Sequence, residues 1–189
     1  MTARKTSSIK LRSSGQQSVE FAAAMALLVG CVFVPLIDAG IIPVRFGLAS
    51  SCLDSLTQQL SRTETLTNAY EMLDSDSGPK TMLKKIGGVK LKETQLTVEI
   101  TSAREPMDTL TIYNPRTFPT EWLPEGNHCP CDYSLHLSVK TEIYPLILAP
   151  SLGRGIPGLT APLPVTFNTR SNWENLGRNP VTREFFLNE

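Results

Sequence analysis

A stretch of seventeen residues without a charge, Phe21–Ile37, constrains this chain more than any other feature of its sequence. An α-helix rises about 1.5 Å per residue, so the stretch is roughly 26 Å long as a helix, just under the ~30 Å hydrocarbon core of a bilayer. Extended to Val44, the helix reaches about 36 Å but then includes Asp38, which we expect near the outer face of the membrane. The sequence therefore predicts a membrane-spanning helix near the N-terminus.

The charges before this stretch are uneven. Every charged residue ahead of Glu20 is basic: Arg4, Lys5, Lys10 and Arg12. Because basic flanks stay on the cytoplasmic side of a membrane helix, we expect the N-terminus in the cytoplasm and the rest of the chain outside. Glu20 lies at the head of the apolar helix, where a carboxylate is costly unless it has a partner. A cut after Gly15 would place the new α-amino group of Gln16 about one helical turn from Glu20, as a cation for that carboxylate.

The order Gly15-Gln16, then Val19-Glu20-Phe21, then an alanine-rich apolar helix resembles the processing site of a type IV prepilin. It is most similar to the TadE-like minor pilins, or pseudopilins, of the tight-adherence (Tad, type IVc) pilus system. In that family a membrane aspartic peptidase cuts after the glycine, and the glutamate is needed for assembly. The resemblance implies that Gly15 ends a leader, Gln16 begins the mature chain, and Glu20 with Phe21 belongs to the assembly region.

The resemblance also implies a structural function, without catalysis and without a cofactor. The chain would assemble into, or prime, a Tad-type pilus or secretion filament used in adhesion. Its partners would be the prepilin peptidase, other pilin subunits and the inner-membrane assembly platform. It would cross the inner membrane once, with its C-terminal domain periplasmic or extracellular, or lie in the pilus fibre.

Two other interpretations of the N-terminal region remain open. An ordinary secretory signal also has a basic start and an apolar core, and cleavage after Ala39-Gly40 would leave a mature chain starting near Ile41. Against this, the apolar run is longer than the usual ~7–15 residues, and the helical pattern continues past that point. The second alternative is an uncleaved membrane anchor in which Glu20 lies at the lipid headgroups. The chain would then be a membrane-anchored or secreted binding domain, with a metal-binding form as one possibility.

Beyond the membrane stretch, apolar residues at three- and four-residue steps predict that the helix continues from Arg45 to Leu73. The sheet or a neighbouring subunit could cover its apolar stripe. Turn-forming residues 74–79 end the helix. Alternating segments then predict four strands: Gln95–Thr101, Thr109–Tyr113, Tyr133–Ile147 and Leu163–Thr169. We therefore expect an α+β, pilin-like fold, with a long N-terminal helix packed on a small antiparallel sheet.

The expected organisation has four parts. A cleaved leader occupies 1–15, the transmembrane part of the helix 16–44, its amphipathic extramembrane part 45–75, and an antiparallel-sheet domain 76–189. Gly30, Pro35 and Pro43 interrupt the helical pattern and predict kinks. Near the C-terminus, Phe185-Phe186-Leu187 is expected to pack into the core. The leader holds four of the eighteen basic residues, so the remainder is mildly acidic and predicts no nucleic-acid surface.

Four cysteines complete the candidate sites. Cys31 lies in the apolar stretch and is expected to be a free thiol. Cys52, Cys129 and Cys131 are expected outside, where disulfides persist. A Cys129–Cys131 bond and a bond from Cys52 to either loop cysteine are the alternatives.

The same loop contains further residues of the types that bind zinc: His128, Asp132 and His136. The Cys-x-Cys spacing differs from that of the usual zinc motifs, and an oxidising compartment competes for the thiols. A Cys–His pair is also a possible nucleophile and base, but neighbours in sequence need not meet in the required geometry. We therefore predict neither a metal site nor an enzymatic activity.

Overall fold

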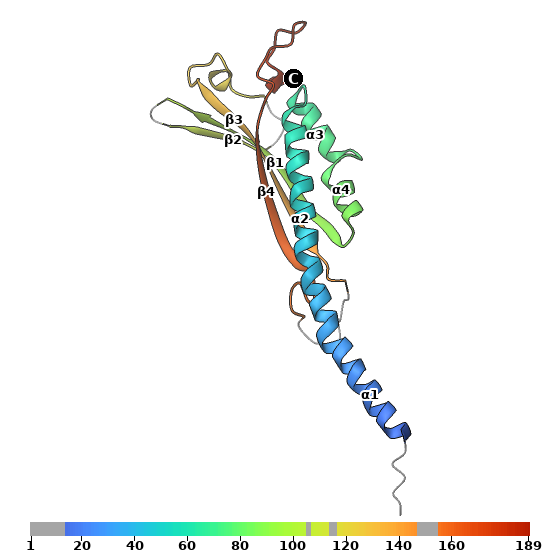
Figure 1. The fold of residues 1–189 in the computed structure, drawn as a ribbon. Coiled ribbons are helices and arrows are strands. Elements are labelled where there is room, and N and C mark those ends of the chain that lie inside the picture. Colours follow the sequence, from blue (N-terminus) through green and yellow to red (C-terminus); the bar gives the residue numbers. More distant parts are fainter. Residues whose placement is uncertain (1–13, 105–106, 114–116, 147–154) are drawn as a thin grey trace, which may run out of the picture.

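A long helix runs along one side of a four-stranded sheet and projects well beyond it (Figure 1). The computed structural model describes residues 14–104, 107–113, 117–146 and 155–189, with side chains described from residue 17 onward. The expected leader, 1–15, lies outside the described residues except for its last two positions. The helix consists of α1 (Ser14–Leu28), a π-helical turn (Val29–Phe33) and α2 (Val34–Ser61). From Gln17 to Ser61 it contains 45 residues, which corresponds to about 67 Å.

The π-helical turn ends at Phe33, two residues before Pro35. Proline lacks the N–H that would bond the carbonyl of Cys31 four residues earlier, and its ring crowds that carbonyl. A π-helical turn changes the local hydrogen-bond spacing and so accommodates the proline without ending the helix. Pro43 lies inside α2, which also continues through it. The predicted interruption at Gly30 and Pro35 is thus a widened turn in a continuous helix.

The helix ends earlier than its apolar periodicity predicts. It stops at Ser61, and a separate helix, α3 (Leu66–Asp74), follows after a short turn. The Thr63 hydroxyl donates back to the carbonyl of Leu60 (2.8 Å), and Thr65 accepts a hydrogen bond from the amide of Asn68 as the N-cap of α3. The expectation of one helix to Leu73 is therefore wrong. Both helices bury the same kind of stripe, so apolar spacing alone does not reveal the break.

A further short helix, α4 (Pro79–Ile86), was not predicted. It has proline at its start and is followed by Gly87, which has a positive φ angle. It packs against both α2 and the first strand of the sheet, with Leu83 fully buried. Eight residues contain only two helical turns, too few for a clear periodic pattern.

All four predicted strands are present. They are β1 (Val89–Ser102), β2 (Thr109–Ile112), β3 (Cys131–Ile143) and β4 (Leu163–Asn172). All neighbours are antiparallel in the order β2-β1-β3-β4, which confirms an α+β fold. Several strand bounds differ from the prediction. β3 ends before Pro145, which cannot donate to a ladder, and β4 continues past Thr169 to Asn172. β1 begins earlier than predicted, at Val89, and a bulge near Leu91 interrupts the alternation that would have revealed its first part.

The core lies between α2 and one face of the sheet. The helix contributes a fully buried stripe at three- and four-residue steps: Ala49, Leu53, Leu56 and Leu60. The register places Val98 of β1 opposite Ile112 on one side and Leu135 on the other, so apolar side chains share this face. The sheet is therefore the partner of α2 in this chain. Phe185 and Leu187 are also buried, as predicted, whereas Phe186, predicted with them, is half-buried.

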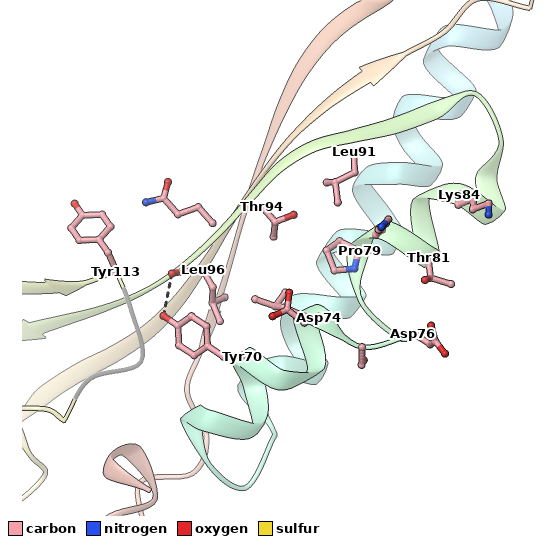
Figure 2. Close-up of a pocket in the computed structure, with 14 residues that line it drawn as sticks. Tyr70, Asp74, Asp76, Pro79, Thr81, Lys84, Leu91, Thr94, Leu96 and Tyr113 are labelled. Carbon is pink, nitrogen blue, oxygen red and sulfur yellow. Dashed lines mark hydrogen bonds between the residues drawn. The ribbon is translucent and has the colours of Figure 1, made fainter.

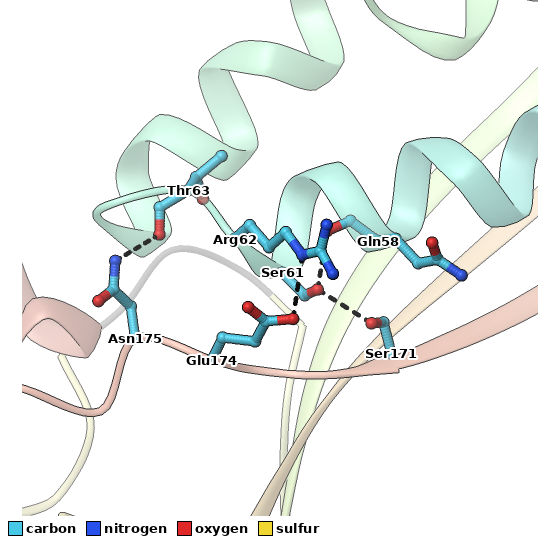
Figure 3. Close-up of polar contacts among 7 residues, drawn as sticks. All are labelled: Gln58, Ser61, Arg62, Thr63, Ser171, Glu174 and Asn175. Carbon is cyan, nitrogen blue, oxygen red and sulfur yellow. Dashed lines mark hydrogen bonds and ion pairs between the residues drawn. The ribbon is translucent and has the colours of Figure 1, made fainter.

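Polar contacts hold the far end of α2 to the exit of β4 (Figure 3). The hydroxyls of Ser61 and Ser171 lie 2.9 Å apart, and Nε of Arg62 lies 3.0 Å from a carboxylate oxygen of Glu174. The side-chain amide of Asn175 donates to the carbonyl of Thr63 (3.0 Å). The Arg62–Glu174 pair is exposed, so the buried core contributes more to the stability of this contact.

Near the middle of the long helix, Gly88 fits beneath Arg45. Gly88 has a φ angle of +68°, and a Cβ atom there would overlap the guanidinium group of Arg45. The Arg45 guanidinium also donates to the carbonyl of Tyr144, and the amide of Tyr144 donates to the carbonyl of Gly88 (2.8 Å). Arg45 thus joins α2 to the start of β1 and to the segment after β3.

We expect Gly88→Ala to lower the free energy of unfolding by more than Gly87→Ala. Both glycines have positive φ angles, a backbone conformation that other residues rarely adopt, so both substitutions carry a backbone cost on the order of 1–3 kcal/mol. No atom lies within 4 Å of a Cβ built on Gly87, whereas a Cβ built on Gly88 would displace Arg45. Chemical unfolding of the detergent-solubilised chain measures both losses. If Gly88→Ala and Gly87→Ala lowered the free energy of unfolding equally, the contact between Gly88 and Arg45 would add no stability.

Candidate functional site

The first half of the long helix is the candidate functional surface. From Gln17 to Phe33 every side chain is exposed, and Glu20 is the one charged residue as far as Ile37. The surface consists of large apolar side chains: Val19, Phe21, Met25, Leu27, Leu28, Val29, Val32, Phe33, Leu36 and Ile37. By length and composition this helix is able to cross a membrane. Water is an unfavourable surrounding for so large an apolar surface, so lipid or protein must cover it.

The predicted processing and assembly residues lie together at the start of this helix. Gly15 and Gln16 belong to the first turn of α1, and Glu20 and Phe21 follow in the second. In an α-helix, residues four apart are neighbours on one face, so the backbone nitrogen of Gln16 comes one turn before Glu20. Glu20 and Phe21 are both exposed. The arrangement leaves the carboxylate accessible to a group on a neighbouring molecule.

The exposed half ends where two loops of the domain contact the helix. Asp38 is 1% exposed, and its carboxylate accepts a hydrogen bond from the amide of Leu146 (2.6 Å). Gly158 packs next to Ile42, and Arg45 donates to the carbonyl of Tyr144. We call the two segments 144–146 and 155–162 the collar. The transmembrane part of the helix was expected to comprise residues 16–44. From Asp38 onward, this segment contacts the domain.

The cysteines divide into one close pair and two separate residues. The sulfur atoms of Cys129 and Cys131 lie 2.9 Å apart. Cys129 is buried, with its sulfur 2.9 Å from the carbonyl of Leu123 and 3.2 Å from the hydroxyl of Tyr133. Burial, together with the adjacent Cys129, raises the pKa of the Cys131 thiol to about 12. All four cysteines are free thiols, and Cys31 and Cys52 belong to the long helix, apart from this pair.

We expect a mild thiol oxidant to join Cys129 to Cys131 in the folded chain. The two sulfurs already lie within hydrogen-bond distance, so a small rotation brings them to the ~2.05 Å of a disulfide. Each thiol loses a hydrogen, and the oxidant, oxidised glutathione, is reduced to two thiols. Peptide mapping after alkylation without reduction measures the bond, and Cys52→Ser serves as the control. Alkylation of both loop cysteines after oxidation, or a bond lost in Cys52→Ser, would contradict it.

The other polar residues near this loop have separate partners. The ring of His128 stacks on Trp122, with centroids 4.4 Å apart. His136 lies 3.2 Å from a carboxylate oxygen of Glu99, and Asp132 pairs with an arginine across the sheet. Over the part of the chain that the structure describes, no three His, Cys, Asp or Glu side chains gather as metal ligands. Of the residues considered for zinc, the structure brings Cys129 and Cys131 together and gives His128, Asp132 and His136 other partners.

A hollow lies between α3, α4 and β1 (Figure 2). Its apolar side includes Leu73, Leu91 and Leu96, and the hydroxyl of Tyr70 donates to the Leu96 carbonyl (3.2 Å). Burial raises the pKa of Tyr70. The charged residues around the hollow are exposed: Asp74, Asp76, Lys80 and Lys84. Sequence reasoning missed the hollow because α4, which forms one wall, was not predicted.

No family model, no curated protein and no solved structure matches this chain.

Proposed function

We propose that this chain is a minor pilin or pseudopilin that assembles into, or primes, a Tad-type pilus or secretion filament after cleavage between Gly15 and Gln16. One observation carries the proposal. The apolar first half of a continuous helix is exposed, while the second half is covered by an α+β domain (Figure 1). A bilayer can cover this surface before assembly, and the helices of neighbouring subunits can cover it in a filament.

Glu20 supports a role in assembly beyond anchoring. A helix that needs only to cross a membrane gains nothing from a carboxylate at its apolar end, because moving that group towards hydrocarbon is costly. A cut after Gly15 creates a cationic amine one turn away, on the same subunit or on the next one. An ion pair in an apolar surrounding is much stronger than one in water, so the pair can set the register between subunits.

The partners and the location follow from the same reasoning. A prepilin peptidase would remove residues 1–15, and an inner-membrane platform would bring the subunit to other pilins. The basic residues ahead of the helix favour a cytoplasmic N-terminus and a periplasmic or extracellular domain. The hydrogen bond from the Leu146 amide to buried Asp38 supports an N-terminal helix retained in the mature protein. A secretory cut near residue 40 would remove Asp38 and its bond to Leu146.

The mature N-terminus tests the proposal. The full chain is expressed with an active prepilin peptidase, and its intact mass and N-terminal peptide are measured. We expect a chain that begins at Gln16, and we expect Gly15→Leu to retain residues 1–15, while the neighbouring Ser14→Ala is still cut. Retention of the leader in the unsubstituted chain, under conditions where a control prepilin is processed, would contradict the proposal. A start near Ile41 would identify a secretory signal instead.

A further inference from the structure

The end of the domain nearest the exposed helix carries two exposed apolar side chains. Leu146 is 56% exposed and Ile156 is 61% exposed, and both belong to the collar. The collar meets the long helix where its exposed apolar half ends, through the bond from the Leu146 amide to Asp38 and the contact of Gly158 with Ile42. The apolar surface of the helix therefore continues onto the domain at this level.

Basic side chains lie just above the collar. Lys84 and Lys85 form the last turn of α4, and Lys90 follows at the start of β1. Gly88, in the turn between these elements, contacts Arg45 of the long helix, which fixes the height of the turn along that helix. Among the residues that the structure describes, Lys84, Lys85 and Lys90 form no ion pair.

The collar lies at the height of the membrane boundary, and the turn with the lysines lies just beyond the headgroup layer. Arg45 lies seven residues beyond Asp38, which is about 10 Å along the helix. The headgroup layer extends roughly 5–8 Å beyond the hydrocarbon core on each side. If Ile37 marks the edge of the core, the collar lies at the boundary of acyl chains and headgroups. Lysine side chains from the turn then reach down to lipid phosphates.

We infer that this membrane-facing end, made up of Leu146, Ile156, Lys84, Lys85 and Lys90, binds the surface of a bilayer that contains anionic phospholipids. The inference rests on the proposed membrane-spanning helix and adds a second contact with lipid. The two apolar side chains insert at the acyl boundary, and the three lysines contact phosphate groups. The domain is thereby held in one orientation on the membrane until the subunit leaves the bilayer.

Tryptophan probes in the full-length chain, reconstituted into vesicles, test the inference. Lipids brominated close to the headgroup quench tryptophan fluorescence at that depth. We expect strong quenching in Leu146→Trp and Ile156→Trp and none in Val181→Trp. Val181 is 87% exposed and belongs to the C-terminal segment 173–189, which lies at the end of the molecule away from the exposed helix (Figure 1). The native Trp122 and Trp173 are buried and provide the unquenched background.

A fourth probe separates this inference from the proposed function. Val29→Trp places the indole at the midpoint of the uncharged stretch Phe21–Ile37, on a side chain that is 48% exposed, where lipid brominated deep in the chains quenches it. Without quenching in Val29→Trp, the membrane-spanning helix itself would be wrong. If the probe in the helix is quenched but the probes at residues 146 and 156 are not, the membrane-spanning helix is supported and the inference about the membrane-facing end is wrong.

The lysines are tested by lipid charge. We expect quenching in Leu146→Trp to be stronger in vesicles of phosphatidylglycerol mixed with phosphatidylcholine than in phosphatidylcholine alone. This difference should disappear when Lys84→Gln, Lys85→Gln and Lys90→Gln are combined with the probe, and it should persist when Lys140→Gln is added instead. Lys140 already pairs with Glu93, 2.7 Å away. An unchanged difference in the triple variant would overturn the role of the three lysines.

Discussion

Glu20→Ala is expected to abolish filament assembly while the chain still enters the membrane. The substitution removes the one carboxylate of the exposed apolar helix and leaves its length unchanged. Membrane insertion depends on the length of the apolar helix, so we expect it to be unchanged. Alanine also costs less free energy in lipid than a carboxylate does. Assembly loses the acceptor for the α-amino group of Gln16. Shear-released filaments and surface adherence measure assembly, and membrane fractionation measures insertion.

The matched control is Gln17→Ala, an exposed neutral position in the turn before Glu20. It should assemble like the unsubstituted chain. Gly15→Leu, which blocks the cut and so the new amine, should fail to assemble to the same extent as Glu20→Ala. The two substitutions together should be no worse than either, because each removes one half of the same pair. Normal filaments in Glu20→Ala would remove the main support for a pilin function.

Leu56→Ala is expected to cost about 2–5 kcal/mol of unfolding free energy, as for other fully buried leucines. Leu56 is 0% exposed and lies in the stripe by which α2 packs on the sheet. The substitution removes apolar surface and leaves a cavity between two rigid elements. Chemical unfolding of the detergent-solubilised chain measures the loss, with the exposed neighbour Gln58→Ala as the control. If Leu56→Ala and Gln58→Ala lowered the free energy of unfolding by similar amounts, α2 would not pack on the sheet through Leu56.

These two predictions separate the two halves of the long helix. Leu56 acts through the folded domain and is expected to matter with or without a membrane. Glu20 has no role in packing the domain, so its substitution should leave the unfolding transition unchanged. A chain that unfolds normally but forms no filaments would assign the first half of the helix to contacts between subunits.

Local sequence patterns predicted most of the fold. Apolar runs and period-two alternation are set by neighbours in the chain, so the exposed helix and all four strands were found, and the α+β class with them. The proposed processing residues, Gly15 and Gln16 with Glu20, also form a local pattern, which needs only a helix to place them one turn apart.

The sequence by itself thus determined the long apolar helix, the strands and the spacing from Gln16 to Glu20, because each depends on residues a few positions apart. The tertiary structure alone decided that Arg45 meets Gly88 and Tyr144, that Asp38 is buried beneath Leu146, and that the collar lies where the exposed helix ends. Those contacts join residues from 43 to 108 positions apart. They depend on strand order and on the way the helix lies on the sheet, which no local periodicity contains.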